Sequence, residues 1–599
     1  MARRTFRIGL VAGSLTLALL AAGCGNSSDG STASKSDNKT SEKLAKADCG
    51  KLKYDKDAPT GGTFTDYSQL SSNADNTTFD PATTQTLAEA QITTAMWDGL
   101  TDFDFTEKCA PVLKGALASK WTANADATVF TFDLKKGYTF SDGTPVLPHN
   151  FKQGWERAGS ADIASPYGYL INNIKGGAVL QAGCLDDPLP EGDAACKEPL
   201  KDKTLDAIVA DDDAMTLTVT LDKANADFPS IVTHQFFMPI SDADEARVPT
   251  SGGWGDKGAT IGNGPFMLAK DGAPGPDKDV TLVPNPKWKG NVYGDTKVHL
   301  DKIIFKSTAD LGTAYQAFDS GDGDDAPIPP GKYGTAQAAY KNNTVDDPNL
   351  GSYYFDFGHD DPVLGGAKNL ELRKAISLAI DRDEINKKVY EGTRTDSTGI
   401  TPPGIPGFKK DLCEYCKFDE KAAKEHFKKW TDAGNKLTAT IPIQYNPGGG
   451  HDQVVQVIVS DLKKYLGIDA KLDPIAETYF RDIPAEGACH ICRSGWYADY
   501  PTYGNFMVDL FSKASIGGNN FGRYDNPDFE KAIAAAQAET DATKRGLDYQ
   551  KAEEILLNTD VSAIPINWYT GATVFRDTVV NNDQPPLGLY LWERMAKTS

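Results

Sequence analysis

Apolar residues along the chain recur with two spacings, every second residue and every third or fourth residue. Alternation with period two predicts strands over residues 129–134 and 209–221, and the Asp142-Gly143 pair predicts a tight turn. The helical spacing predicts helices over residues 87–100, 372–382 and 454–466. Asn526, followed by Pro527, predicts the beginning of another helix. Strands and helices are therefore expected from about residue 61 onwards.

The first residues carry a separate pattern. Arg3, Arg4 and Arg7 precede an apolar run over residues 8–20 that is too short to span a bilayer, which is typical of a signal peptide. The run ends in Leu20-Ala21-Ala22-Gly23-Cys24, which is similar to a bacterial lipobox, whose Cys becomes the lipidated N-terminus. The alternative is a secreted protein with a chance Cys. We expect Cys24 to anchor the protein to the outer face of the cell membrane.

Residues 25–46 contain almost no large apolar side chain. Such a segment cannot bury enough surface to fold, so it is expected to be a flexible tether. The chain has 599 residues, which predicts more than one domain, and a net charge of −21, which gives it no electrostatic attraction to nucleic acid. No later apolar run has the length of a transmembrane helix.

Nine cysteines are present, and eight remain when Cys24 is set aside. An exported chain meets oxidising conditions, so four disulfides are expected, although the sequence does not fix their connectivity. In sequence order the cysteines fall into neighbours: Cys49 and Cys109, Cys184 and Cys196, Cys413 and Cys416, Cys489 and Cys492. The two C-x-x-C pairs could instead form a zinc site or a redox motif. We expect the protein to bind neither a metal ion nor a cofactor.

The chemistry concentrates in residues 493–506, which hold a cation, an anion six positions later and five aromatic side chains. A site for a zwitterion needs this mixture, because a carboxylate pairs with an ammonium, a guanidinium pairs with a carboxylate, and ring faces cover the rest. Gly495 would let another backbone come close. The alternative is that Arg493 and Asp499 pair with each other at the surface and that the aromatic residues belong to the core.

Residues 495–501, Gly-Trp-Tyr-Ala-Asp-Tyr-Pro, resemble the G-W-x-A-D-Y segment of the oligopeptide-binding branch of family 5 solute-binding proteins. In that branch the Asp holds the α-ammonium of a peptide, the Arg six residues earlier can receive its carboxylate, and the backbone between them pairs with the ligand. The resemblance therefore implies a ligand site formed by Arg493, Gly495, Trp496, Tyr497 and Asp499. Thr502 departs from the family, which often has an acidic or amide residue there.

Other segments match the family in its order from about residue 61 to the C-terminus. Leu117-Ala118-Ser119-Lys120-Trp121 and Ser141-Asp142-Gly143-Thr144-Pro145-Val146 resemble its signature region, and residues 236–240 and 563–569 resemble strands that return to the first lobe. By position from Asp80-Pro81, Gln85 and Leu87 fall where relatives offer backbone groups to the ligand. A helix there would explain the apolar spacing equally well.

The resemblance implies an α/β, two-lobed periplasmic-binding-protein fold of the class II type, from the large cluster with an extra sub-domain and with the ligand cleft between the lobes. The expected divisions are 1–23 signal peptide, 24–48 lipidated tether, 49–97 first part of lobe I, 98–235 extra sub-domain, 236–350 second part of lobe I, 351–568 lobe II and 569–599 C-terminal part of lobe I.

The implied function is that of an extracytoplasmic receptor of an ABC importer, which binds short peptides and delivers them to a membrane permease driven by cytoplasmic ATPases. A monomer is expected. Motifs of metalloproteases, serine hydrolases and P-loop enzymes are absent from the sequence, so an enzyme is not expected. The runner-up is a receptor of the same fold for a non-peptide solute, such as an oligosaccharide, a metal chelate or a siderophore.

Overall fold

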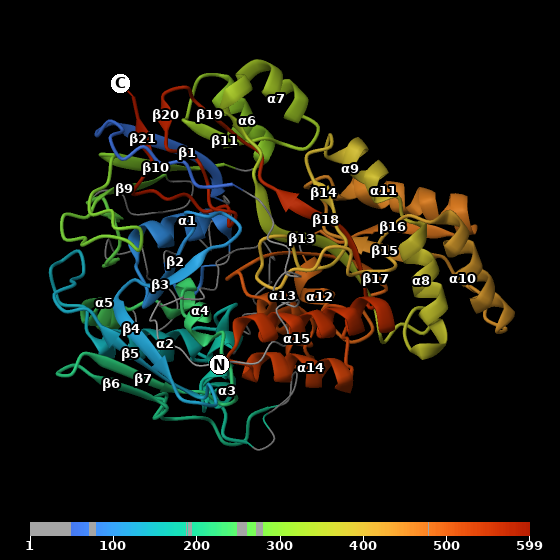
Figure 1. Cartoon of the computed structure of the whole chain (residues 1–599), viewed down its shortest axis with the longest axis horizontal. Coiled ribbons are helices and arrows are strands. Elements are labelled where there is room, and N and C mark those ends of the chain that lie inside the picture. Colours follow the sequence, from blue (N-terminus) through green and yellow to red (C-terminus); the bar gives the residue numbers. More distant parts are fainter. Residues whose placement is uncertain are drawn as a thin grey trace, which may run out of the picture.

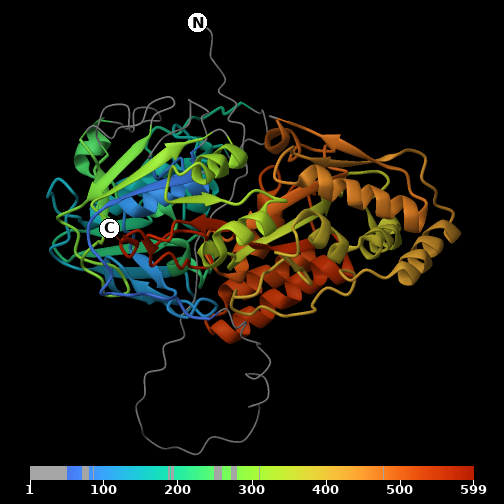
Figure 2. The same cartoon turned by 90° about the horizontal axis from the view of Figure 1, so that it is seen from above.

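The computed structural model describes residues 50–70, 80–84, 86–186, 189, 195–247, 260–270, 279–308, 310–476 and 478–598. The expected signal peptide and tether, with Cys24 and Cys49, and the expected ligand residue Gln85 lie outside the described residues. The described chain forms two lobes that lie side by side (Figures 1 and 2). The first lobe contains the N-terminal half and the last strands, and the second lobe contains the region between them.

The first lobe is built on a four-stranded sheet of order β1-β10-β9-β8. Its strands are β1 (Thr63–Leu70), β10 (Lys302–Ser307), β9 (Val280–Pro284) and β8 (Phe266–Leu268). Helix α1 (Leu87–Met96) packs against β1 and β8 and begins with a capping box, in which Thr86 and Glu89 each accept from the other's backbone N–H. Phe64, Phe305 and Trp592 share the core of this body.

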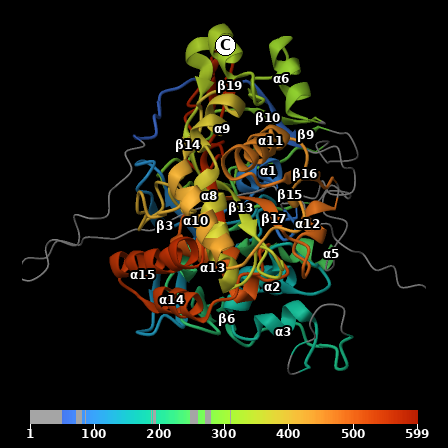
Figure 3. The same ribbon diagram turned by 90° about the vertical axis from the view of Figure 1, so that its right-hand side faces the viewer.

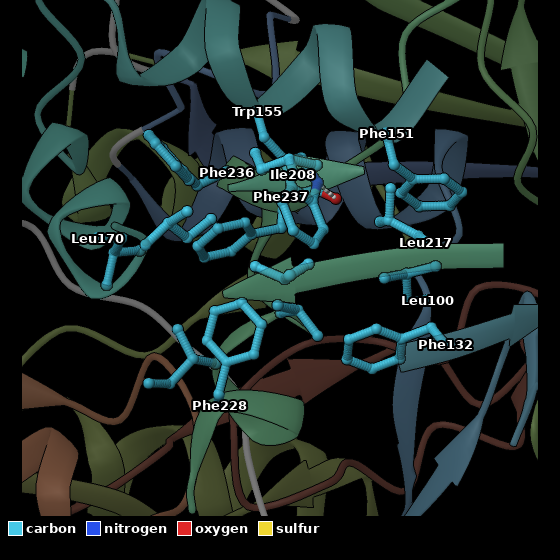
Figure 4. Close-up of a cluster of buried hydrophobic side chains, with 14 of the residues drawn as sticks. Leu100, Phe132, Phe151, Trp155, Leu170, Ile208, Leu217, Phe228, Phe236 and Phe237 are labelled. Carbon is cyan, nitrogen blue, oxygen red and sulfur yellow. Dashed lines mark hydrogen bonds between the residues drawn. The ribbon is translucent and has the colours of Figure 1, made fainter. Parts of the chain in front are cut away.

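A second body of the first lobe, which we call the sub-domain, holds an antiparallel sheet of order β4-β5-β7-β6. Its strands are β4 (Ala118–Ala123), β5 (Val129–Leu134), β7 (Thr216–Thr220) and β6 (Ile208–Asp211). Helix α2 (Pro148–Gly159) places Trp155 over this sheet, among Phe228 and Phe237 (Figure 4). The indole is fully buried and donates to the carbonyl of Phe237, so its one polar atom is satisfied.

The second lobe surrounds a six-stranded sheet of order β14-β18-β13-β17-β15-β16. Its strands are β14 (Thr395–Asp396), β18 (Ala563–Thr570), β13 (Pro348–Phe357), β17 (Ile491–Tyr497), β15 (Ile441–Tyr445) and β16 (Ala470–Pro474). The central strand β13 is buried almost along its whole length, because layers of helices cover the sheet (Figure 3). Those helices are α8 (Leu370–Ala379), α9 (Arg382–Val389), α10 (Glu420–Asp432), α11 (His451–Asp461), α13 (Tyr503–Phe511), α14 (Pro527–Ala538) and α15 (Ala542–Glu554).

Smaller elements complete the described chain. The short strands pair as β2 (Thr101–Asp104) with β3 (Val112–Gly115) and as β20 (Val579–Val580) with β21 (Ala596–Lys597). The remaining helices are α3 (Gly177–Ala182), α4 (Phe228–Ile231), α5 (Asp242–Arg247), α6 (Leu311–Asp319), α7 (Tyr333–Tyr340) and α12 (Tyr479–Asp482). No described helix is long and apolar enough to cross a membrane.

The chain crosses between the lobes at two neighbouring places. A three-stranded sheet of the first lobe, β11 (Asp325–Pro327), β19 (Thr573–Phe575) and β12 (Thr344–Val345), lies at the crossing. β12 continues into β13 through Asp346-Asp347, and β18 returns to β19 through Gly571-Ala572. The N–H of Gly571 donates to the carbonyl of Asp347, 3.0 Å away. Two short adjacent connections of this kind are a typical position for a hinge between two lobes.

Most of the elements predicted from periodicity are confirmed. The 129–134 strand is β5, the 209–221 segment forms the β6–β7 hairpin, and Asn526 caps α14 with its side chain. The first predicted helix ends earlier than expected, at Met96, and residues 101–104 are already a strand. The strand expected over 236–240 is wrong: a 3-10 turn (Gln235–Phe237) stands there, because His234 accepts the N–H of Phe236 and bends the backbone.

Three of the expected disulfides are present in the described chain, Cys184–Cys196, Cys413–Cys416 and Cys489–Cys492. Both C-x-x-C pairs are therefore disulfides in this structure, which argues against a shared zinc site. Cys109 is also disulfide-bonded, while its neighbour in the expected pairing, Cys49, lies outside the described residues. Cys489–Cys492 lies at the beginning of β17, directly before Arg493.

Candidate functional site

Strand β17 contains four of the residues that the sequence predicts at the ligand: Arg493, Gly495, Trp496 and Tyr497. On one side it pairs with β13 over its whole length, from Gly351 opposite Tyr497 to Phe357 opposite Ile491. On its other side it pairs with β15 only at Ile491 and Cys492. From Arg493 onwards this second edge of β17 has no strand beside it in the described part of the chain. An open edge of this kind can accept an extended peptide as an added strand.

The orientation of the open edge follows from Tyr479. Its hydroxyl donates to the carbonyl of Arg493 at 2.7 Å and lies 3.2 Å from the carbonyl of Gln444 on β15, so it sits where β15 and β17 part. The Arg493 carbonyl therefore points away from β13. Because the N–H and C=O of alternate residues in a strand point to the same side, the main-chain groups of Gly495 and Tyr497 also face the open edge.

The Arg493 side chain is buried, with 8% of its residue surface exposed. Its guanidinium donates to Asn446 at 3.2 Å and to the Tyr569 hydroxyl at 3.3 Å, and lies 5.0 Å from the centre of the Tyr353 ring. No described carboxylate lies within ion-pair distance of it, and its Nε has no hydrogen-bond partner. A buried cation that is held by neutral groups and keeps an unsatisfied N–H is a candidate receptor for an anion from outside the protein.

Gly495 is needed for a reason that the sequence did not show. A Cβ at this position would lie 2.2 Å from the Tyr569 hydroxyl and 2.8 Å from the Arg493 guanidinium. The absent side chain thus leaves the room through which Arg493 reaches Tyr569. Tyr497, two residues further along the same face, lies against Tyr569 with 4.4 Å between ring centres.

Tyr497 also connects the second lobe to the first. Its side chain packs against the small apolar cluster of Ala90 and Leu589, which the Leu87 side chain touches as well. Leu87 and Tyr497, both expected at the ligand, therefore meet at the boundary between the lobes. Leu87 is the first residue of helix α1, so its N–H is one of the helix's unpaired donors while its carbonyl belongs to the helix.

Asp499 is completely buried two residues after the end of β17. Its carboxylate accepts from the hydroxyl of Tyr167, which belongs to the sub-domain, at 3.3 Å, and from the side-chain amide of Asn505 on α13 at 3.2 Å. Burial, with the nearby charge of Asp499 as the second cause, raises the pKa of Tyr167 well above its usual range, so that this hydroxyl remains a proton donor. The carboxylate thus sits between the two lobes.

Asn505 organises this end of the site. Its side-chain oxygen accepts from the Asp499 N–H and from the indole of Trp496, both at 2.9 Å. Its amide also donates to Asp509, whose carboxylate accepts from the Tyr500 hydroxyl. Burial raises the pKa of Asp509 to about 6, while Tyr500 and Asn505 oppose that shift. This end of the site therefore carries acidic groups, while Arg493 makes the other end basic.

The placement excludes the alternative that Arg493 and Asp499 form a surface ion pair. Both side chains are buried, and no contact joins the two. Six residues of extended chain separate them by about 20 Å at most. Trp496 lies with its ring in the core of the second lobe, beside Tyr354 and Phe506, so its contact with a ligand stays a prediction. The same holds for Gln85, which lies outside the described residues.

Several residues of the site carried no signal in the sequence. Tyr569, Tyr353 and Asn446 come from three strands or their ends far from residue 493, and only the order of the strands brings them to Arg493. Tyr167 and Asn505 at the acidic end are further examples. Tyr569 stood in a segment read as a strand, and aromatic residues in strands usually serve the core.

A cavity of about 900 Å³ adjoins the site between the sub-domain and the second lobe. Tyr169 and Asn225 line it on one side, and Tyr500, Thr502 and Asp509 line it on the other. Arg493 and Asp499 are not among its lining residues, and Lys223 is the only cation among the described residues that line it. We place the candidate site at the open edge of β17, where the buried Arg493 guanidinium has an unsatisfied Nε.

The chain resembles known proteins over most of its length. The profile of the bacterial extracellular solute-binding proteins, family 5 Middle, matches residues 112–518. The oligopeptide-binding protein OppA of Bacillus subtilis is 28% identical over 468 residues, which cover 76% of this chain and 80% of the relative. The periplasmic oligopeptide-binding protein OppA of Escherichia coli is 27% identical over 545 residues, which cover 90% and 93%.

Among solved structures, the murein tripeptide binding protein MppA of Escherichia coli superposes with a TM-score of 0.69, over 90% of this chain and 98% of that protein. At 23% identity this likeness shows the fold alone. The two-lobed α/β fold expected from the sequence is thereby confirmed.

Proposed function

The chain belongs to family 5 of the bacterial extracellular solute-binding proteins, and we propose that it captures short peptides between its lobes for an ABC importer. The family consists of binding proteins, which agrees with the expectation that the chain is not an enzyme. The observation that carries the proposal is the open edge of β17, which has a buried guanidinium at one end and a buried carboxylate beyond the other.

This arrangement supports one orientation of the bound peptide relative to β17. The ammonium of the ligand would meet Asp499, and its carboxylate would meet Arg493. Between them, the N–H and C=O groups of Gly495 and Tyr497 would pair with the ligand backbone, which gives affinity without regard to its side chains. The peptide would therefore run antiparallel to β17. The separation of about 20 Å at most limits the distance between the two charged ends to a few residues.

Closure about the hinge would enclose this ligand. The two lobes already touch at Tyr167 and Asp499, and a second contact joins Asp227 of the sub-domain to Arg545 of α15, with 3.0 Å between Nε and Oδ1. Rotation about residues 346–347 and 571–572 would separate both contacts and open the way to β17. Binding that requires both lobes then favours the closed form.

Delivery and anchoring form the remainder of the proposal. The loaded protein would dock on a membrane permease whose ATPases lie in the cytoplasm, and Cys24 would hold it at the outer face of the cell membrane through lipid. What supports these steps is the family and the lipobox at Leu20–Cys24.

The experiment is to identify what the protein carries. The protein is purified from its source without denaturation, its bound molecules are released with acid, and the extract is read by mass spectrometry. We expect short peptides with free amino ends. The control is the Asp499→Asn variant, which should release much less peptide. Recovery of an oligosaccharide, a chelate or a siderophore, with no peptide above the control, would favour the non-peptide receptor instead.

A further inference from the structure

A second arginine lies beside the basic end of the site. Arg394 directly precedes β14, and its guanidinium stacks 3.7 Å from the ring centre of Tyr390 and 4.8 Å from that of Tyr569. It also lies 6.0 Å from the centre of the Tyr353 ring, which Arg493 contacts at 5.0 Å. Two cations therefore converge on one group of tyrosines, which we call the two-arginine cluster: Arg394, Arg493, Tyr353, Tyr390, Tyr569 and Asn567.

The described part of the chain supplies no counter-ion for either charge. Arg394 donates to the side-chain oxygen of Asn567 at 3.1 Å and, as with Arg493, no carboxylate of the described chain lies within ion-pair distance of it. Described carboxylates do pair with many other cations, as Asp383 does with Lys387 and Glu420 with Lys424. Like charges close together repel each other, so an arrangement of two unpaired guanidiniums costs stability unless something else stabilises it.

Buried donors around the two guanidiniums also lack acceptors. The Arg493 Nε, the Tyr390 hydroxyl and the Asn567 side-chain amide nitrogen are all enclosed and have no hydrogen-bond partner among the described residues. The residues that carry them expose 8%, 4% and 1% of their surface. Buried donors of this kind normally find acceptors, so three of them beside two cations indicate a place for a group with several acceptor oxygens.

The neighbouring imidazole of His451 carries no charge, neither a counter-ion nor a third positive charge. His451, the first residue of α11, contacts the Tyr353 hydroxyl through Nδ1 at 3.1 Å. Burial, and then the charges of Arg493 and Arg394, lower its pKa to about 2. His451 is therefore neutral at ordinary pH and does not add to the repulsion. Both guanidiniums lower the pKa of His451, and both lie near the Tyr353 ring. The two arginines therefore belong to one electrostatic site.

We propose that the two-arginine cluster binds the acidic end of the ligand, so that the protein prefers peptides whose last residue carries a side-chain carboxylate in addition to the terminal one. The inference rests on the proposed function and names its ligand class. Arg493 would receive one carboxylate and Arg394 the other, with Asn567 and Tyr390 donating to the remaining oxygens. One terminal carboxylate would leave one of the two guanidiniums unpaired.

The test compares synthetic alanine peptides of three, four and five residues that end in Glu, Gln or Ala, by titration calorimetry. For the length that fits, we expect the peptide ending in Glu to bind the wild type at least ~10-fold more tightly than the one ending in Gln, which has nearly the same shape. The Arg394→Gln variant should bind both equally, and Arg394→Lys should keep part of the difference. Arg481→Gln, which removes a surface cation paired with Asp482, serves as the matched control and should keep all of it.

Two outcomes would overturn the inference while leaving the proposed function intact. One is equal affinity of the wild type for the Glu and Gln peptides, a comparison that needs no variant to fold. The other is an undiminished preference in Arg394→Gln. If no peptide of any composition binds, the proposed function itself fails and the inference falls with it.

Discussion

At the scale of the residue, the basic end of the site depends on a charge that the protein holds with neutral groups. Arg493 is held by an amide, a phenol and an aromatic ring. Such neighbours fix the position of a charge without neutralising it, which leaves its field for a ligand. The cost is lower stability, because a buried charge is compensated less than it was in water.

Asp356 on β13 offers a direct test of how much stability a buried charge costs. It is 2% exposed and accepts a hydrogen bond from the Ser494 hydroxyl at 2.5 Å. Burial raises its pKa to about 7, while Ser494 lowers it. A raised pKa means that the folded state holds the proton more tightly than the unfolded state. The free energy of unfolding therefore falls by about 1.4 kcal/mol for each unit by which the pH rises between about pH 4 and pH 7.

In the Asp356→Asn variant we therefore expect a smaller difference in thermal midpoint between pH 5 and pH 8 than in the wild type, measured by calorimetry. Asp432→Asn, on an exposed face of α10, is the control and should behave as the wild type. An unchanged pH dependence in Asp356→Asn would mean that its carboxyl does not titrate in this range.

The residues that a sequence can reveal are those whose chemistry is gathered in one segment. Arg493, Gly495 and Asp499 stand within seven positions, so their types and spacing pointed to a site. Arg394, Tyr569 and Tyr167 could not be found in this way, because strand order and lobe contact bring them there. The role of Gly495 also changed: its missing side chain makes room for Arg493 and Tyr569.

At the scale of the element, periodicity predicted the strands and helices well and the ends less well. Helix α1 ends at Met96 because the chain turns there into β2, although the apolar spacing continues to Leu100. The apolar segment 236–240 failed as a strand because burial alone makes a segment apolar, and its backbone finds local hydrogen bonds in a 3-10 turn.

Helix α1 offers a test of main-chain binding in the first lobe. Leu87 is its first residue, where proline is tolerated because the N–H has no partner within the helix, and Thr86 before it is already extended. Leu87→Pro should therefore fold as well as Leu87→Ala, while both remove the same contact with Ala90 and Leu589. If the Leu87 N–H binds the peptide, Leu87→Pro lowers affinity further, by about 1–2 kcal/mol or roughly 10-fold. Equal affinities in calorimetry would exclude that hydrogen bond.

At the scale of the whole molecule, the proposed function requires two lobes that move, and the proposed lipid anchor would hold them at the membrane. The family and the order of the segments allowed the two-lobed fold to be predicted from the sequence. The contacts that close the lobes could not be predicted, because they join residues more than 300 positions apart, such as Asp227 and Arg545.

The Asp227–Arg545 pair should stabilise the closed form. Its side chains expose only 3% and 6% of their surface and lie on opposite lobes. Asp227→Asn should weaken peptide binding at least ~10-fold, because the loss of one partner leaves the other buried and unpaired only when the lobes close. Small-angle X-ray scattering should show a larger radius without ligand. The control Asp295→Asn breaks a pair with Arg594 within the first lobe and should spare affinity. An unaltered affinity in Asp227→Asn would show that the pair does not contribute to closure.

The anchor is tested by Cys24→Ala in the full chain. If Cys24 carries acyl chains, each buried CH₂ contributes about 0.8 kcal/mol to membrane binding, and the variant should move from the membrane to the soluble fraction. Ser28→Ala, four residues further along, is the control and should remain on the membrane. A wild-type protein that is wholly soluble without detergent would contradict lipidation.

The central claim, that Asp499 receives the ammonium of a peptide, is tested most directly by calorimetry with one peptide in its free and its N-acetylated forms. Asp499→Asn has nearly the same shape and removes the charge, and its one side-chain oxygen can still accept from Tyr167 or from Asn505. Loss of one partner of a buried ion pair costs about 3–5 kcal/mol, so acetylation should weaken wild-type binding by at least ~100-fold. Acetylation should affect Asp499→Asn far less, because both changes remove the same interaction. If the wild type binds the free and the acetylated peptide equally, Asp499 is not the anchor, and the assignment to peptides loses its chemical basis.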